Sequence, residues 1–148
     1  MSTRFLTDST ADLTTEQAAE RGLELIYFPY YLDGEEYSSA PQAANRMDSD
    51  EFYRRMEAGG ETRTAQINQA YFAEHFDDIL KAGDDIFYIA FSSGLSGTAD
   101  NAAVVARELM EKYPERHIWV VDSLCASTGQ GLLADMAMRL HRAGRSDQ

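Results

Sequence analysis

The sequence predicts an α/β fold in which a mainly parallel sheet carries helices on both of its faces. Short apolar segments typical of strands alternate along the chain with amphipathic segments typical of helices, and this alternation favours parallel strands joined by crossover helices. Loops rich in Ser, Thr, Asp and Gly follow three of these strands, at residues 7–12, 92–98 and 122–128. Since ligands of such sheets bind beyond the carboxyl ends of the strands, these loops are the first candidates for a binding site.

The amino-terminal segment contains a short strand followed by a capped helix. Residues 4–7 are predicted to form the strand. Thr14 is the expected N-cap of the helix, with Gln17 at the capping-box position three residues later. Gly22 is expected to end the helix because glycine readily adopts the left-handed conformation found after helix C-termini.

The next segment is predicted to be extended. Residues 23–32 are apolar and rich in aromatic and branched side chains, which favours one strand. Pro29 interrupts this strand, so its second half is expected at a sheet edge or a bulge. Asp33 and Gly34 form a turn signal, and residues 35–38 are expected to return as a hairpin arm.

Two helices are predicted in the middle of the chain. The first begins near Asp48 and ends at Gly59. Residues 61–66 are polar and are interpreted as a loop. The second helix begins at about Asn68 and runs to Lys81, with its aromatic and aliphatic side chains recurring on one face.

The carboxyl-terminal part alternates buried strands with helices. Residues 86–91 form a continuous apolar run, typical of a strand covered on both faces. A helix is predicted over residues 99–113 and ends before Pro114. Residues 118–121 are expected to be another buried strand, and residues 129–141 the last helix.

Length and composition favour one compact domain. The chain has 148 residues, with 25 acidic and 13 basic residues and a formal charge of −12. This charge disfavours nucleic acid and anionic membranes as partners. No apolar run is long enough to span a bilayer, and no signal peptide is evident. The lone Cys125 is consistent with a reducing cytoplasm.

The loop at residues 92–98 has the composition of a site for a negatively charged oxygen. It joins a buried strand to a helix N-terminus, where free N–H groups and the positive end of the helix dipole favour anions. Its glycines allow close approach of a ligand, and its serines can donate hydrogen bonds. Ser and Gly are also common capping and turn residues, so a purely structural loop is equally compatible with the pattern.

Stricter catalytic and cofactor motifs are missing from the sequence. The glycine spacing matches neither nucleotide-binding loop, and the loop is one residue short of a hydrolase nucleophile elbow. A serine-dependent hydrolase or phosphotransferase acting on an acyl or phosphate substrate is the alternative, but it would need a base. The histidines are expected outside these loops, and Cys125 has no basic neighbour in the sequence to activate it. Asp8, Asp12 and Asp122 could bind Mg²⁺ but are better explained as caps of the following turns.

Taken together, several motifs resemble those of the DegV family over nearly the whole chain. In chain order they are Thr7-Asp8-Ser9-Thr10-Ala11-Asp12-Leu13, Asp33-Gly34-Glu35-Glu36-Tyr37, Glu51-Phe52-Tyr53, Thr64-Ala65-Gln66, Ser92-Ser93-Gly94-Leu95-Ser96-Gly97-Thr98, Val121-Asp122-Ser123 and the stretch from Ala126 to Gly131. Each motif is weak alone, but their order and spacing make the match specific. The resemblance implies a bacterial cytoplasmic protein that binds a long-chain fatty acid, without catalysing a reaction, and presents it to a fatty-acid kinase.

The resemblance also implies which residues bind the fatty-acid carboxylate. The family's threonine in a Thr-Ser-Gln motif corresponds to Thr64, and its loop serine corresponds to Ser93; Ala65 departs from the usual serine. The expected carboxylate-binding residues are Thr64, Ser93, Ser92, Gly94 and Ser96, supported by Asp8, Ser9, Gln66 and Gly97. No cofactor or metal is implied. Family members carry a second domain that covers the acyl chain, so this chain resembles their first domain, and its site is expected to be incomplete alone.

Overall fold

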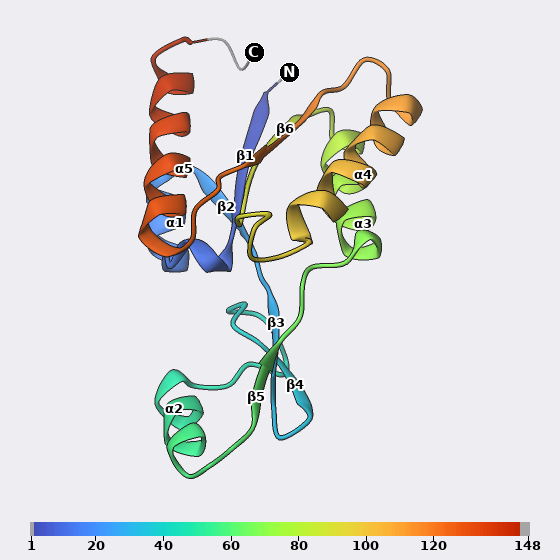
Figure 1. Ribbon diagram of the computed structural model, residues 1–148. Helices are drawn as coiled ribbons and strands as arrows, with labels where there is room; N and C mark the ends of the chain where they lie inside the picture. The colour runs from blue at the N-terminus through green and yellow to red at the C-terminus, as the bar shows by residue number, and fades with distance from the viewer. Residues whose placement is uncertain (1, 146–148) are drawn as a thin grey trace. The chain divides into compact units, whose positions relative to one another are not determined.

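The computed structural model describes residues 2–145, which form two compact units. Unit 1 comprises residues 2–26 and 67–145, and unit 2 comprises the intervening segment Tyr27–Gln66. Figure 1 follows the chain through both units from its amino to its carboxyl end. The expectation of one domain completed by a second domain in a longer protein stays a prediction.

Unit 1 is built on a four-stranded parallel sheet. Its strands are β1 (Thr3–Asp8), β2 (Leu23–Ile26), β6 (Asp85–Ala90) and β7 (Ile118–Asp122), arranged in the order β2-β1-β6-β7. All three neighbouring pairs are parallel. The predicted α/β class with a mainly parallel sheet is therefore confirmed.

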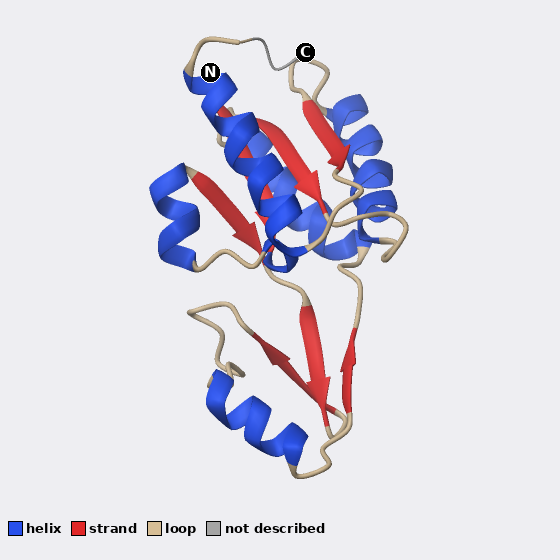
Figure 2. Cartoon of the chain, turned by 60° about the vertical axis from the view of Figure 1, so that its left-hand side comes forward, coloured by secondary structure: helices blue, strands red, loops and turns tan. Residues whose placement is uncertain are grey.

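Helices cover both faces of this sheet. The helices α1 (Thr15–Arg21) and α5 (Ser127–Arg142) contact it on one side, and α3 (Gln69–Lys81) and α4 (Thr98–Lys112) on the other. Figure 2 shows the same arrangement from a second direction. A short 3-10 turn, Ser9–Ala11, follows β1 and contacts α5.

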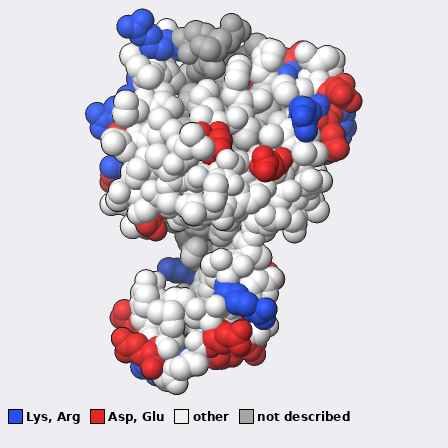
Figure 3. All heavy atoms as spheres, in the orientation of Figure 1, with Lys and Arg blue, Asp and Glu red and all other residues white. Residues whose placement is uncertain are grey.

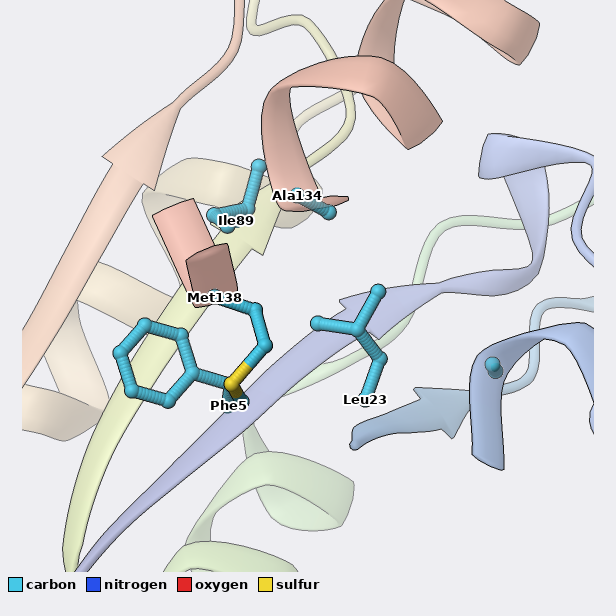
Figure 4. Close-up of a cluster of buried hydrophobic side chains, with 6 residues drawn as sticks. Phe5, Leu23, Ile89, Ala134 and Met138 are labelled. Carbon is cyan, nitrogen blue, oxygen red and sulfur yellow. The ribbon is translucent and has the colours of Figure 1, made fainter. Parts of the chain in front are cut away.

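Apolar side chains fill the layer between the sheet and the α1–α5 face. Phe5, Leu23, Ile89, Ala134 and Met138 form a buried cluster that joins three strands to α5 (Figure 4). Complete burial of a large apolar side chain stabilises a fold by about 1.5–3 kcal/mol. This layer fixes α5, and with it the loop that precedes α5, against the sheet.

Local capping signals set the helix ends as predicted. The Thr14 side chain accepts a hydrogen bond from the Gln17 amide at 3.1 Å, and the Gln17 side chain accepts one from the Thr14 amide at 3.0 Å. Gly22 ends α1 with a left-handed φ of 74°. Asn68 caps α3 by accepting from the amide of Tyr71 at 2.9 Å. These ends are predictable because each depends on a few adjacent residues.

Gly131 allows α5 to approach the turn after β1. A Cβ atom at this position would lie 2.9 Å from the carbonyl oxygen of Ala11, closer than van der Waals contact allows. We expect Gly131→Ala to lower the free energy of unfolding by about 1–3 kcal/mol, the usual cost of overpacking. Chemical denaturation measures this change.

Gly129 provides a matched control on the same helix. A Cβ atom there would lie 3.4 Å from its nearest neighbour, the Cβ of Cys125. Because alanine is a better helix former than glycine, Gly129→Ala is expected to leave stability unchanged or to raise it by up to about 1 kcal/mol. Equal stabilities of the two variants would contradict the proposed close approach.

Unit 2 consists of a small antiparallel sheet and one helix. Strands β3 (Pro29–Leu32), β4 (Glu35–Ser38) and β5 (Thr62–Thr64) lie in the order β4-β3-β5, and the helix is α2 (Ser49–Glu57). The hairpin predicted between β3 and β4 is confirmed. Its two turn residues, Asp33 and Gly34, both have the positive φ that such a tight turn requires.

The prediction of one strand over residues 23–32 was wrong. This segment forms β2 of one sheet and β3 of the other. Pro29 does not place β3 at an edge, because β3 is the central strand of its sheet. Proline is tolerated there as the first residue of the strand, and its carbonyl oxygen still accepts a hydrogen bond from the Ala65 amide at 3.3 Å.

The prediction of a loop over residues 61–66 was wrong as well. Thr62–Thr64 forms the edge strand β5, with Thr64 opposite Tyr30 and Thr62 opposite Leu32. All three side chains of β5 are exposed. The strand is therefore defined by backbone pairing with β3, which a polar side-chain pattern does not reveal.

Candidate ligand-binding site

Hydrogen bonds join two of the predicted loops at the carboxyl edge of the parallel sheet. The Ser123 amide, after β7, donates to the carbonyl oxygen of Ala90 at the end of β6, at 3.1 Å. The Ser92 amide, after β6, donates to the carbonyl oxygen of Cys125 at 3.0 Å. The loops that follow β6 and β7 thus form one connected surface, as the parallel topology predicts.

Ser93 is exposed on this surface and is held by Asp122. Its amide donates to Asp122 Oδ1 at 3.1 Å, and the Leu124 amide donates to the same oxygen at 3.0 Å. Hydrogen bonding from the Ser93 side chain is the main cause that lowers the pKa of Asp122, followed by the bond from the Leu124 amide. Asp122 therefore acts as a cap that organises both loops, and its carboxylate is the acceptor of the hydrogen bonds that Ser93 donates.

Ser92 shapes the loop from within. Its hydroxyl accepts from the Gly94 amide at 3.2 Å, and its carbonyl oxygen accepts from the amides of Leu95 and Ser96 at 3.0 and 3.1 Å. These three amides are satisfied inside the turn, and Ser92 itself is buried. A direct role for Ser92 and for the Gly94 amide in binding a carboxylate stays a prediction.

Ser96 links the loop to the first turn of α4. Its hydroxyl accepts from the Thr98 amide at 3.2 Å and shares a hydrogen bond of 2.9 Å with the Thr98 hydroxyl. Thr98 is fully buried, and its Oγ1 also accepts from the Ile67 amide at 3.2 Å. Gly97 is the N-cap of α4 and contributes no side-chain bond. The pair Ser96–Thr98 therefore supplies the cap that Gly97 lacks.

Asp8 is an internal support of the site. Its side chain is fully buried, and Oδ2 accepts from the Tyr88 hydroxyl at 2.8 Å and from the Phe91 amide at 3.0 Å. Oδ1 accepts from the Thr10 amide at 3.2 Å and from Gln130 Nε2 at 3.0 Å. Burial, followed by the nearby Asp8 charge, raises the pKa of Tyr88 well above its ordinary value. Asp8 thus fixes the start of the β6–α4 loop through Phe91.

The aspartates act as caps, which the sequence favoured over a magnesium site. Asp8 caps the 3-10 turn that contains Ser9, and Asp122 caps the turn after β7. Asp12 ends that 3-10 turn with a positive φ of 53°. Within residues 2–145, no group of three histidine, cysteine or acidic side chains is arranged to hold a metal ion.

The three histidines lie on other parts of unit 1. His75 on α3 faces the Glu24 carboxylate at 3.2 Å, and the His141 ring lies 4.7 Å from that of Phe5. His117 precedes β7, at the opposite end of that strand from Asp122. The Cys125 side chain lies against the Gly129 position. These locations match the sequence expectation that the three histidines lie outside the serine-rich loops.

Thr64 and Gln66 belong to unit 2, whereas Ser92, Ser93, Gly94 and Ser96 belong to unit 1. Thr64 is the last residue of β5, and both its side chain and that of Gln66 are exposed. Joint binding of one carboxylate by Thr64 and Ser93 stays a prediction.

The fold and the loops define an open parallel α/β protein, a class whose members bind ligands at the carboxyl edge of the sheet. The chain belongs to the DegV family: the family described as "Uncharacterised protein, DegV family" matches residues 2–148. The DegV domain-containing protein YteA of Lactococcus lactis is 33% identical over 146 residues, which cover 99% of this chain and 50% of YteA. A DegV domain-containing protein of Streptococcus pyogenes serotype M1 is 37% identical over 147 residues, covering 99% and 50%.

Solved structures of similar proteins share the fold. A DegV family protein from Thermus thermophilus, described as binding fatty acid, matches with a TM-score of 0.81 and 27% identity over 99% of this chain and 50% of its own. A stearic acid-binding protein from Eubacterium ventriosum matches with a TM-score of 0.85 and 24% identity over the same shares. The chain thus spans about half the length of the relatives that it matches.

Proposed function

We propose that this chain is the carboxylate-binding part of a fatty-acid-binding protein, in which the Thr64 and Ser93 hydroxyls donate to the ligand. The observation that carries the proposal is Ser93, exposed on the connected loops at the carboxyl edge of the sheet. Membership of the DegV family supports it, as does the likeness to a Thermus thermophilus protein described as binding fatty acid. We further propose that the protein acts in the cytoplasm and presents the acid to a kinase without catalysing a reaction itself.

Local hydrogen bonds must overcome the net charge of −12 for an anion to bind. On the face of unit 1 seen in Figure 3, most of the surface is formed by residues other than Asp, Glu, Lys and Arg. The Asp122 carboxylate accepts a hydrogen bond from the Ser93 amide at 3.1 Å, and hydrogen bonding from the Ser93 side chain lowers its pKa. A ligand carboxylate that bonds to the Ser93 hydroxyl therefore takes over the position of Asp122 as acceptor.

The acyl chain is expected to contribute most of the affinity. Burial of each CH₂ group contributes about 0.8 kcal/mol, so a long chain outweighs the hydrogen bonds to its carboxylate. The part of the relatives that this chain does not span is the proposed cover for that tail. The 148-residue chain alone is accordingly expected to bind weakly.

Native mass spectrometry of the protein as purified, followed by lipid extraction, tests the proposal. A fatty acid bound at a stoichiometric ratio, lost on extraction and restored by adding oleate, is the expected result. Oleyl alcohol, which has the same chain without the carboxylate, is the control ligand and is expected to bind more weakly. Equal binding of oleate and oleyl alcohol would contradict recognition through the carboxylate.

A serine hydrolase or phosphotransferase is disfavoured by the surroundings of Ser93. Among the described residues, Asp122 is the only side chain that bonds to Ser93. Hydrogen bonds lower the pKa of the Asp122 carboxyl group. A carboxylate with a lowered pKa is a weak general base near neutral pH. Turnover of an acyl ester that disappears in Ser93→Ala would nevertheless support the enzyme.

A further inference from the structure

We propose that Thr98 and Asn101 are positioning residues for the carboxylate site, because they hold the chain at Ile67, three residues after Thr64. This inference rests on the proposed function. Neither residue is among the expected ligand-binding residues, and both lie in the first turn of α4. Their proposed role is to limit the distance that Thr64 can move away from α4, the helix that begins at the serine-rich loop.

The side chains of Thr98 and Asn101 form hydrogen bonds with both backbone polar groups of Ile67. The Ile67 amide donates to Thr98 Oγ1 at 3.2 Å, and Asn101 Nδ2 donates to the Ile67 carbonyl oxygen at 2.9 Å. Ile67 is 3% exposed and Thr98 is 0% exposed, so water does not compete well for these bonds. Gln69 Nε2 in turn donates to Asn101 Oδ1 at 3.4 Å. Hydrogen bonds to both the amide and the carbonyl oxygen of Ile67 fix the direction of the backbone there as well as its position.

Chain length then limits the freedom of Thr64. Ile67 is the first residue of unit 1 after the chain leaves unit 2. Each extended residue spans about 3.3–3.6 Å, so the Cα of Thr64 stays within about 11 Å of that of Ile67. This limit holds for every arrangement of the two units, but it restricts Thr64 only while Ile67 itself is held.

The Thr98 hydroxyl also connects Ile67 to Ser96, because it bonds to both residues. When the Thr98 hydroxyl donates to Ser96 Oγ, that oxygen accepts from both the hydroxyl and the amide of Thr98. The proton of Ser96 is then left to donate to an external acceptor such as a carboxylate. Consecutive hydrogen bonds polarise one another, so a ligand on Ser96 would strengthen the bond from Ile67 to Thr98.

The test compares Thr98→Val, which keeps the shape but removes the hydroxyl, with Thr98→Ser, which keeps the hydroxyl. The measurement is the ratio of the affinities for oleate and for oleyl alcohol. We expect Thr98→Val to reduce this ratio about tenfold, because a displaced Thr64 would lose its hydrogen bond to the ligand carboxylate. Thr98→Ser is expected to keep the ratio. Exchange of the Ile67 amide hydrogen is expected to become faster in Thr98→Val only.

Asn101→Ala is a second variant, which removes the hydrogen bond from Asn101 to the Ile67 carbonyl oxygen. Alanine is the best helix former, so α4 is expected to remain folded even if Thr98→Val does not fold. A purely structural role would weaken the binding of both ligands equally, leave the ratio unchanged, and overturn the inference. If the unmodified protein binds oleate no better than oleyl alcohol, the proposed function itself fails, and with it the inference.

Discussion

Replacing both Thr64 and Ser93 by alanine is expected to lower the affinity for oleate by at least about 100-fold, because two hydrogen bonds to a charged oxygen are lost at about 1.5–3 kcal/mol each. Both side chains are exposed, so their truncation leaves no cavity in the core. The free energy of unfolding is accordingly expected to stay within about 0.5 kcal/mol of the native value, the usual range for surface substitutions. Isothermal titration with oleate and urea denaturation of the same samples separate the two effects.

Thr62→Ala is the control for this double variant. Thr62 lies on the same edge strand as Thr64, is equally exposed, and is not among the expected ligand-binding residues. Its replacement is expected to leave the affinity for oleate within about twofold, since surface substitutions have small effects. Unchanged affinity in the double variant would show that the carboxylate is bound elsewhere.

Replacing Asp8 by alanine is expected to cause the largest loss of stability, about 3–5 kcal/mol. The substitution leaves the Tyr88 hydroxyl and the Phe91 amide without the Oδ2 acceptor that they share. Buried donors that lose their acceptor cost about 1–3 kcal/mol each. The midpoint of urea denaturation measures the loss, and binding of oleate is expected to fall as well because Phe91 leads into the serine-rich loop.

Asp8→Asn separates the effect of shape from that of hydrogen bonding. The asparagine side chain fills the same space but offers one acceptor oxygen in place of two. It can therefore satisfy the donors on one side of Asp8 and not those on the other, and an intermediate loss of stability is expected. A stability equal to that of the native protein would mean that these buried bonds contribute little.

The sequence predicted those features that depend on neighbouring residues. The capping box at Thr14 and Gln17, the turn at Asp33 and Gly34, and the alternation of strands and helices in unit 1 are all local patterns. The division of residues 23–32 between two sheets is not local. Both halves are apolar, and only their different pairing partners show that they belong to separate units.

The candidate site divides in the same way. The loop at residues 92–98 was found because hydroxyl and glycine residues follow a buried strand directly. The supporting role of Gln130 was missed, and Thr98 was not singled out within that loop, because each is an ordinary polar residue near the start of a helix. Gln130 is buried and donates to Asp8, which lies 122 positions away in the sequence. A polar side chain on the inward face of a predicted helix, close to an expected ligand loop, was the available signal.

The placement of unit 2 between β2 and α3 has a consequence for the order of folding. β1 and β6 are neighbours in the sheet, yet Thr7 and Ile89, which share a hydrogen bond, lie 82 positions apart. Closure entropy grows with the logarithm of loop length, so halving the loop by removing unit 2 would save only about 0.6 kcal/mol. Contacts so distant in sequence nevertheless slow folding, whereas a hairpin such as β3–β4 forms in about 1–10 μs. The inserted segment is therefore expected to acquire its turn and first strand pairs long before the sheet on either side of it closes.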